Sequence, residues 1–201
     1  EGARASLAQA ILFAAFLVIP ATAALVAIAP EIVTGLFAYG AFSTADAAAS
    51  AAALAAYAAG MPANIMVKIL QPAFYATGRP GFVLRVSIAA VAVNVALSLS
   101  LMPVLGHVGL ALATSVSGFV AAAALLLRLA RDGQLELPAA VSLLRIGLAT
   151  AVMLAALYLA LSQLPSLPAA ALLALLVGAG GSAYLAAAVA LRAIPGQLLK
   201  R

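Results

Sequence analysis

The chain has 201 residues, of which 67% are hydrophobic and only 7% are charged. A soluble domain is about 45 to 50% apolar and about 25% charged, so this composition excludes an ordinary soluble protein and indicates that lipid is the main solvent. The ten Lys and Arg residues outnumber the five Asp and Glu residues. No aromatic residues alternate with the basic ones, however, so a nucleic-acid partner is not expected. The lack of cysteine excludes disulfides and thiolate metal sites.

Six apolar segments are long enough to cross a membrane, since a helix needs about 20 residues to span a hydrocarbon core of about 30 Å. They are residues 7–29, 47–70, 82–101, 108–127, 142–164 and 169–191. The segments are apolar on all sides, whereas the strands of a membrane barrel alternate apolar and polar residues. The expected fold class is therefore all-α, a polytopic transmembrane helix bundle with six spans. Short connections are expected at residues 29–31, 39–46, 78–81, 102–107, 131–134 and 165–168.

Two of the spans contain helix-breaking residues. Pro20 lies in the middle of the first span and predicts a kink there. In the second span the run GMPAN at residues 60–64 interrupts the apolar pattern at about mid-depth. Transporters use such breaks as hinges and binding sites, which makes Asn64 a candidate substrate contact. Proline kinks also occur in helices that have no such role, so both interpretations stay open.

All ten basic residues fall on one side of this up-and-down path, beside the two termini and beside the second-to-third and fourth-to-fifth connections. The opposite connections carry Glu31, Asp46 and the single histidine, His107. The positive-inside rule places loops rich in Lys and Arg on the cytoplasmic side, so both chain ends are expected to be cytoplasmic. The even number of spans agrees, because it puts both ends on the same side.

Lys68 and Arg85 lie within predicted spans, where a charged side chain is costly unless it has a function or reaches water. Both lie near the expected cytoplasmic ends of their spans, so their long side chains could snorkel to the interface as anchors. Contact with a polar substrate is the alternative interpretation.

Asn94 lies in the middle of the third span, where its amide needs a partner inside the bundle. Ser87 and Ser98 share its helical face, and Thr114 lies at the matching depth of the fourth span. One interpretation is a small polar site for a cation or a head group. The other is hydrogen bonding between the two helices.

Three segments resemble the MurJ (MviN) family of lipid II flippases. They are VKILQPAFYATGRP at residues 67–80, LFAYGAFS at 36–43 and LGHVGLALATS at 105–115. Members of this family have fourteen helices and cytoplasmic termini. The resemblance implies that the six spans correspond to the ninth to fourteenth helices, so we expect the chain to be the C-terminal portion of a longer protein.

The resemblance implies two parts in this chain. Residues 1–131 would be four helices of the C-terminal lobe, and residues 132–201 would be two additional helices that form an apolar groove for a polyprenyl tail. The implied function is to move lipid II, the lipid-linked peptidoglycan precursor, from the inner to the outer leaflet of the bacterial cytoplasmic membrane by alternating access. Such a transporter is no enzyme and needs no cofactor. Its other partners would be membrane lipid and the upstream helices of the same protein.

The resemblance also implies where the substrate makes contact. Lys68, Arg79 and Arg85 are the basic residues nearest the expected cytoplasmic entrance. Together with Asn64 they are the candidate contacts for the head group of lipid II.

A cation site is implied in the same way, because some family members hold a monovalent cation between helices. Asn94 and Thr114 resemble two of the ligand positions, and Leu110 could supply a backbone carbonyl. Ser98 stands where the family leads us to expect a carboxylate. Coupling to sodium, to protons or to the membrane potential alone stays open.

Two other functions are consistent with the spans. A related exporter of polysaccharide-lipids or drugs would share the fold, and a non-transporting membrane scaffold for cell-wall synthesis would need no polar site. A membrane enzyme is disfavoured, because the spans contain no pairing of a nucleophile with a base and no metal-binding motif.

Overall fold

The computed structural model describes residues 2–37, 43–163 and 167–195, so the expected connections at 39–46 and 165–168 lie partly outside the described residues. The regular structure in these residues is all helical. The helices are α1 (Gly2–Ala27), α2 (Ala29–Phe37), α3 (Thr44–Ala59), α4 (Met61–Ala76), α5 (Pro80–Leu105), α6 (His107–Arg131), α7 (Ala140–Gln163) and α8 (Ala169–Ala190). In the described residues, six units are long and apolar enough to span a membrane, with α3 and α4 forming one of them. The predicted all-α bundle of six spans is therefore confirmed.

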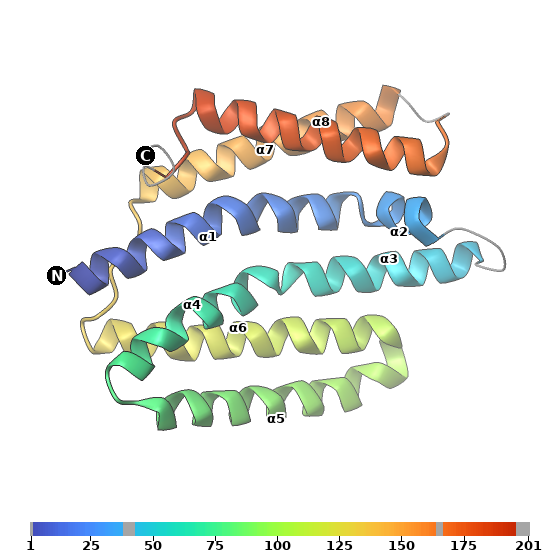
Figure 1. Ribbon diagram of the computed structural model, residues 1–201. Helices are drawn as coiled ribbons and strands as arrows, with labels where there is room; N and C mark the ends of the chain where they lie inside the picture. Colours follow the sequence, from blue (N-terminus) through green and yellow to red (C-terminus); the bar gives the residue numbers. More distant parts are fainter. Residues whose placement is uncertain (1, 38–42, 164–166, 196–201) are drawn as a thin grey trace.

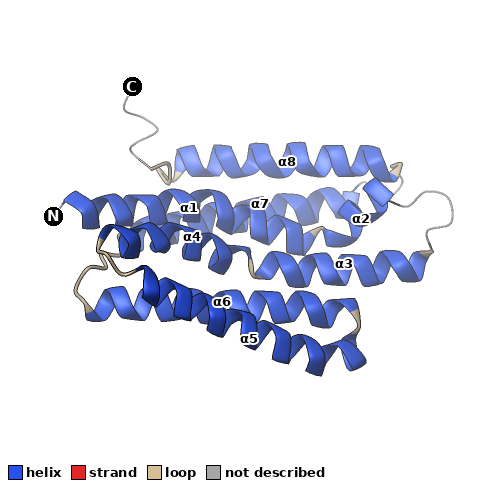
Figure 2. Cartoon of the chain, turned by 60° about the horizontal axis from the view of Figure 1, so that its bottom comes forward, coloured by secondary structure: helices blue, strands red, loops and turns tan. Residues whose placement is uncertain are grey.

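The spans lie side by side, and each runs antiparallel to the span that follows it in the sequence (Figure 1). α7 and α8 form one edge of the bundle, followed by α1, then α3 with α4, then α6, and finally α5 at the other edge (Figures 1 and 2). α6 contacts α3, α4 and α5, while α1 contacts α7 on one side and α3 and α4 on the other. Packing between helices distant in sequence therefore holds the layers together.

Besides a small cluster between α2 and α3, two larger clusters of buried side chains fill the space between the helices. The first joins α1, α7 and α8 and includes Phe16, Met153 and Leu176. The second joins α1, α4, α5 and α6, and its members Leu70 and Leu125 are completely buried. The outward face of α5 is apolar and exposed, as expected for a surface that meets lipid tails instead of water.

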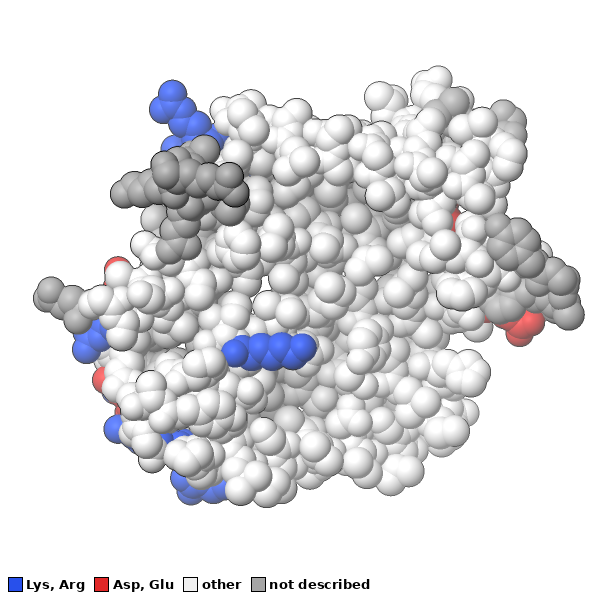
Figure 3. Space-filling view, in the orientation of Figure 1, with Lys and Arg blue, Asp and Glu red and all other residues white. Residues whose placement is uncertain are grey.

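The basic residues gather toward one end of the bundle, which we call the basic end. It is formed by the starts of α1, α5 and α7 and by the ends of α4, α6 and α8 (Figure 1). Figure 3 shows most of the visible Lys and Arg side chains over this end. The described basic residues are Arg4, Lys68, Arg79, Arg85, Arg128, Arg131, Arg145 and Arg192. Most of them thus share one side of the bundle, as the sequence predicts, while Lys68 lies eight residues before the end of α4.

A short helix, α2, replaces the connection expected at residues 29–31. Pro30 suits the first turn of a helix, where the missing N–H would be unpaired anyway. The carboxylate of Glu31 is favourable in the same turn, because it faces the positive end of the helix dipole. At the start of α3, the Ser43 hydroxyl accepts a hydrogen bond from the backbone N–H of Asp46 at 3.2 Å and caps the helix.

Two span ends differ from the prediction, because prolines there do not end the helices. The second and third spans are expected to end at residues 70 and 101, but α4 continues to Ala76 and α5 to Leu105. Pro72 and Pro103 lie inside these helices. A helix can tolerate such a proline, because it removes only one backbone hydrogen bond and the next turn can still form. The expected connection at 102–107 is wrong in length: Gly106, with a φ of 54°, is the whole turn between α5 and α6.

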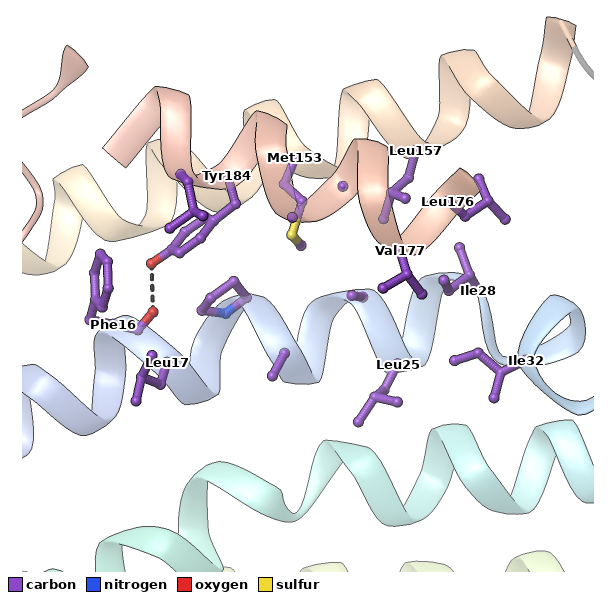
Figure 4. A pocket seen from close by; sticks show the side chains of 16 residues that line it. Phe16, Leu17, Leu25, Ile28, Ile32, Met153, Leu157, Leu176, Val177 and Tyr184 are labelled. Atoms are coloured by element: carbon purple, nitrogen blue, oxygen red, sulfur yellow. Dashed lines mark hydrogen bonds between the residues drawn. The ribbon is translucent and has the colours of Figure 1, made fainter. Parts of the chain in front are cut away.

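A hydrogen bond between distant helices compensates for the proline in α1. Pro20 has no N–H, so the carbonyl of Phe16, four residues earlier, loses its partner within the helix. The hydroxyl of Tyr184 on α8 donates to this carbonyl at 2.5 Å (Figure 4). α1 therefore continues through its proline, and the same bond ties it to α8.

Replacing Tyr184 with Phe removes this hydroxyl and keeps the ring. We expect Tyr184→Phe to lower the free energy of unfolding by about 1 to 3 kcal/mol, because a buried carbonyl is left without a donor. Reversible unfolding of the intact protein in mixed detergent micelles measures the change. Tyr158→Phe is the matched control, since Tyr158 is 77% exposed and its loss should change little.

A second substitution separates the hydrogen bond from ring packing. Pro20→Ala restores an N–H for the Phe16 carbonyl, so Tyr184→Phe should be clearly less damaging in that background. An equal loss of stability with and without the proline would contradict this account of the bond.

Candidate functional site

The second span is broken at Gly60, which caps the end of α3 and the start of α4. This confirms the break predicted from residues 60–64. Pro62 contributes to it, because it lacks the N–H that would continue the hydrogen bonding of α3. The hydroxyl of Ser115 on α6 donates to the carbonyl of Ala56 at 2.7 Å and so bonds a backbone group beside the break. Both halves of the span thus rest on α6.

The backbone of α6 approaches the break closely, because glycines leave room on both helices. A Cβ atom on Gly60 would lie 2.6 Å from the Cα of Ser115. A Cβ atom on Gly118 would lie 2.7 Å from the Oδ1 of Asn64. The structure therefore places Asn64, one of the predicted substrate contacts, with its amide oxygen against the backbone of α6.

Lys68 lies one turn after Asn64 on α4, and its side chain is exposed. Because α4 continues to Ala76, Lys68 lies about 12 Å before the end of the helix at about 1.5 Å per residue. This position is deeper than a span ending at residue 70 predicts. Neither of the ion pairs formed by the described residues involves Lys68. An interfacial anchor and a contact with an anion both remain consistent with this position.

The other two predicted basic contacts lie together at the basic end. Arg79 and Arg85 line a cavity of about 360 Å³ with Phe82 of α5 and Arg128 of α6. The carboxylate of Asp132 pairs with Arg79, and it also accepts from the Nε of Arg128 at 3.2 Å. No residue of α4 lines this cavity. The predicted substrate contacts therefore fall into two groups, one on α4 and one at the start of α5.

The predicted polar set between the third and fourth spans is brought together by the fold. The amide of Asn94 on α5 donates to the hydroxyls of Thr114 and Ser117 on α6 at 3.2 and 3.4 Å. The Thr114 hydroxyl donates in turn to the carbonyl of Leu110 at 3.0 Å. Ser98, one turn further along α5, is half-buried and takes no part in these bonds. This arrangement supports an interhelical contact, the second of the two interpretations drawn from the sequence.

An apolar groove of about 480 Å³ runs between α1, α7 and α8 (Figure 4). Its lining includes Leu17 and Leu25 of α1, Met153 of α7 and Val177 of α8. The one phenol in the groove, that of Tyr184, directs its hydroxyl to the backbone of α1. The family resemblance implies a groove made by the last two helices, and the structure adds the first span as its third wall.

Sequence reasoning missed two residues that complete these sites. Asp132 follows Arg128 by four residues at the end of α6, a spacing typical of a helical ion pair, so a local signal existed for it. Tyr184 has no such signal, because its partner Phe16 lies 168 positions away in the sequence.

A bundle of six spans, with one span broken near its middle and an apolar groove at its side, is the architecture of a polytopic membrane protein. Residues 1–178 match the family model described as lipid II flippase MurJ. The chain belongs to this family. It is a multi-pass protein of the bacterial inner membrane.

Individual relatives agree with this assignment. A probable lipid II flippase MurJ of Rhizobium tropici is 39% identical over 127 residues, which cover 63% of this chain and 24% of the relative. A second, of Rhizobium meliloti (strain 1021), is 36% identical over 154 residues, which cover 76% of this chain and 29% of the relative. The chain thus spans less than a third of the length of either protein.

A solved structure shows the same fold. It is described as lipid II flippase MurJ in an inward closed conformation, and it matches 98% of this chain with a TM-score of 0.82 and 22% sequence identity. The match covers 40% of that chain. The helical architecture of this family is therefore confirmed for the described spans.

A methyl group at the break tests whether α6 holds the two half-helices. We expect Gly60→Ala to lower the free energy of unfolding by about 1 to 3 kcal/mol, because the new Cβ must displace the backbone of α6. The unfolding midpoint of the intact protein in detergent measures this. Gly147→Ala is the matched control, since no atom lies within 4 Å of a Cβ built on that helical glycine. Equal stability of the two variants would contradict the close contact.

Proposed function

We propose that the protein carrying this chain flips lipid II from the inner to the outer leaflet of the cytoplasmic membrane by alternating access. The observation that carries the proposal is the match of residues 1–178 to the lipid II flippase MurJ family. A pyrophosphate-linked sugar head group is too polar to cross hydrocarbon uncovered, whereas its polyprenyl tail can stay in lipid. The protein therefore shields the head group while it moves, and it makes or breaks no covalent bond.

The apolar groove is the proposed binding site for the polyprenyl tail of lipid II. A polyprenyl chain offers only carbon surface, so it gains dispersion contacts from a lining of aliphatic side chains and needs no hydrogen-bond partners. The groove between α1, α7 and α8 has such a lining. Residues 132–201 would thus hold the tail together with α1, and the upstream helices of the whole protein would complete the path of the head group.

Lys68 is the residue of this chain that we propose for contact with the pyrophosphate. Its ammonium group lies along α4 on one helical face with Asn64, Gln71 and Tyr75, so the span offers a polar stripe beside its break. Attraction between an ammonium and a phosphate strengthens where water is scarce. The roles of Arg79 and Arg85 as substrate contacts stay predictions.

Coupling to a monovalent cation also stays a prediction. The residues concerned are Asn94, Ser98, Leu110 and Thr114. A cation needs oxygen atoms that are free to coordinate it, whereas the Thr114 hydroxyl already bonds both Asn94 and Leu110. Sodium, proton and membrane-potential coupling would all be compatible with the proposed function.

Depletion of the intact protein in its own host tests the proposed function. The readout is the accessibility of lipid II to a probe confined to the outer side of the cytoplasmic membrane. We expect lipid II to accumulate and become protected from the probe. Exposure at the normal rate would favour the polysaccharide-lipid or drug exporter, and normal exposure with a disordered cell-wall machinery would favour the scaffold.

Lys68 can be tested in the same assay by complementation. We expect Lys68→Ala to slow flipping about ten- to a hundredfold, because a charge-assisted contact contributes about 1.5 to 3 kcal/mol. Arg192→Ala is the control, since Arg192 lies beyond the end of α8, away from the break. Lys68→Arg keeps the charge and should retain most activity. Equal tolerance of the two alanine variants would leave Lys68 as an anchor.

The basic end is proposed to face the cytoplasm, in line with the positive-inside rule. A cysteine replacing Ser43, at the far end, should react with a membrane-impermeant maleimide added to spheroplasts, and one replacing Gly133 should not. Both positions are exposed, and the chain contains no other cysteine. The reverse labelling pattern would place the basic end outside.

A further inference from the structure

We propose that the cavity at the basic end binds the phosphate of an anionic phospholipid from the surrounding leaflet. The cavity has a volume of about 360 Å³ and lies between the start of α5 and the end of α6. We call it the arginine pocket; its lining residues are Gly78, Arg79, Gly81, Phe82, Arg85 and Arg128. The proposal is independent of whether the transported substrate is lipid II.

The arginine pocket carries an excess of positive charge. Arg79, Arg85 and Arg128 line it, and among the described residues the one carboxylate that pairs with them belongs to Asp132. Arg79 and Arg128 share a single oxygen of that carboxylate. Each guanidinium has five N–H donors, so most of the donors in the pocket are left for another anion. Phosphate oxygens suit guanidinium groups, because both can form two parallel hydrogen bonds.

Phe82 holds two of the guanidinium groups in place. Its ring centroid lies 5.9 Å from the Cζ of Arg85 and 5.7 Å from that of Arg128, which are cation–π distances. The ring itself stacks on Phe74 at 5.3 Å, and Phe74 is buried in the core of the bundle. Two arginines therefore pack on a ring that is itself held by the buried core. Because their side chains are already restricted, a ligand loses less binding free energy to the ordering of these side chains.

The Nε of Arg85 makes the weakest contact of the set. It donates to the carbonyl of Gly81 at 3.3 Å, and neither ion pair of the described residues involves it. Gly81 lies in the first turn of α5, where backbone N–H groups and the helix dipole also favour an anion. A phosphate placed beside Arg85 would thus meet positive partial charge from the backbone and full charge from the side chains.

The depth of the pocket in the membrane favours a lipid as the source of the phosphate. α5 has 26 residues and is about 39 Å long at about 1.5 Å per residue, so its first turn extends beyond a hydrocarbon core of about 30 Å into the head-group layer. Next to Arg85, Leu84 and Ile88 point outward and are 61% and 60% exposed. Acyl chains attached to a phosphate in the pocket would lie along this apolar face.

Native mass spectrometry of the intact protein in detergent tests the proposal directly. The probes are dioctanoyl phosphatidylglycerol, which carries a negative charge, and dioctanoyl phosphatidylcholine, which carries none overall. We expect the protein to retain the anionic lipid in preference to the zwitterionic one. Arg85→Gln and Arg128→Gln should each weaken this binding about fivefold, since each basic residue near an anionic lipid contributes about 1 kcal/mol.

Arg131→Gln is the matched control, because Arg131 is also exposed near the end of α6 but does not line the pocket. It should leave binding unchanged, and the helical circular dichroism of all variants should match that of the original protein. Arg85→Lys keeps the charge and should weaken binding less than Arg85→Gln.

Four results would overturn the proposal. Equal retention of both lipids, or an equal loss with Arg131→Gln, would show that no specific site exists. Displacement of phosphatidylglycerol by millimolar inorganic phosphate would identify a site for soluble anions. Binding of a polyprenyl pyrophosphate in the pocket without binding of phosphatidylglycerol would make it part of the substrate path.

Discussion

The structure depends on one constraint of the membrane interior: a backbone carbonyl that loses its helical partner must find another inside the protein. One span is broken at Gly60 and another continues through Pro20, and a hydroxyl from another helix bonds a backbone carbonyl near each of these positions. Tyr184 donates to α1 beside Pro20, and Ser115 donates to α3 beside Gly60. The same two bonds connect α8 to α1 and α6 to α3. Each of these hydrogen bonds therefore both bonds an irregular part of the backbone and fixes which helices pack together. The apolar groove lies beside the first bond, and the polar stripe of α4 begins beside the second.

The sequence predicted the six spans, the break in the second span and the common side of the basic residues, because length, apolarity and charge are local properties of a segment. It failed at the ends of the second and third spans, where Pro72 and Pro103 indicate loops by composition but lie inside helices. A helix can continue past a proline, because the ring removes only one backbone hydrogen bond and the turns on either side of it keep theirs. Local composition does not contain that information.

The candidate sites follow the same division. Single residues such as Lys68 and Asn94 are conspicuous in an apolar span, so the sequence identified them, and the fold then showed that Asn94 bonds Thr114 and Ser117. The sequence identified Arg79 and Arg85 as candidate contacts but did not predict the arginine pocket. Arg85 and Arg128 are distant in sequence, and they meet over Phe82 only when α5 packs against α6. The third wall of the groove was missed for the same reason, since α1 and α8 come from opposite ends of the chain.

The close approach at Gly60 has a consequence for how the sequence can diverge. No side chain larger than hydrogen fits there while Ser115 and the backbone around it keep their place. A larger residue at 60 would require α6 to move away, and the Ser115 hydroxyl would then no longer reach the Ala56 carbonyl. Positions 60 and 115 are thus physically coupled. A lineage that changes either residue must supply another hydrogen-bond donor to the carbonyl of residue 56. Covariation of this pair across relatives would be the evolutionary trace of a hydrogen bond.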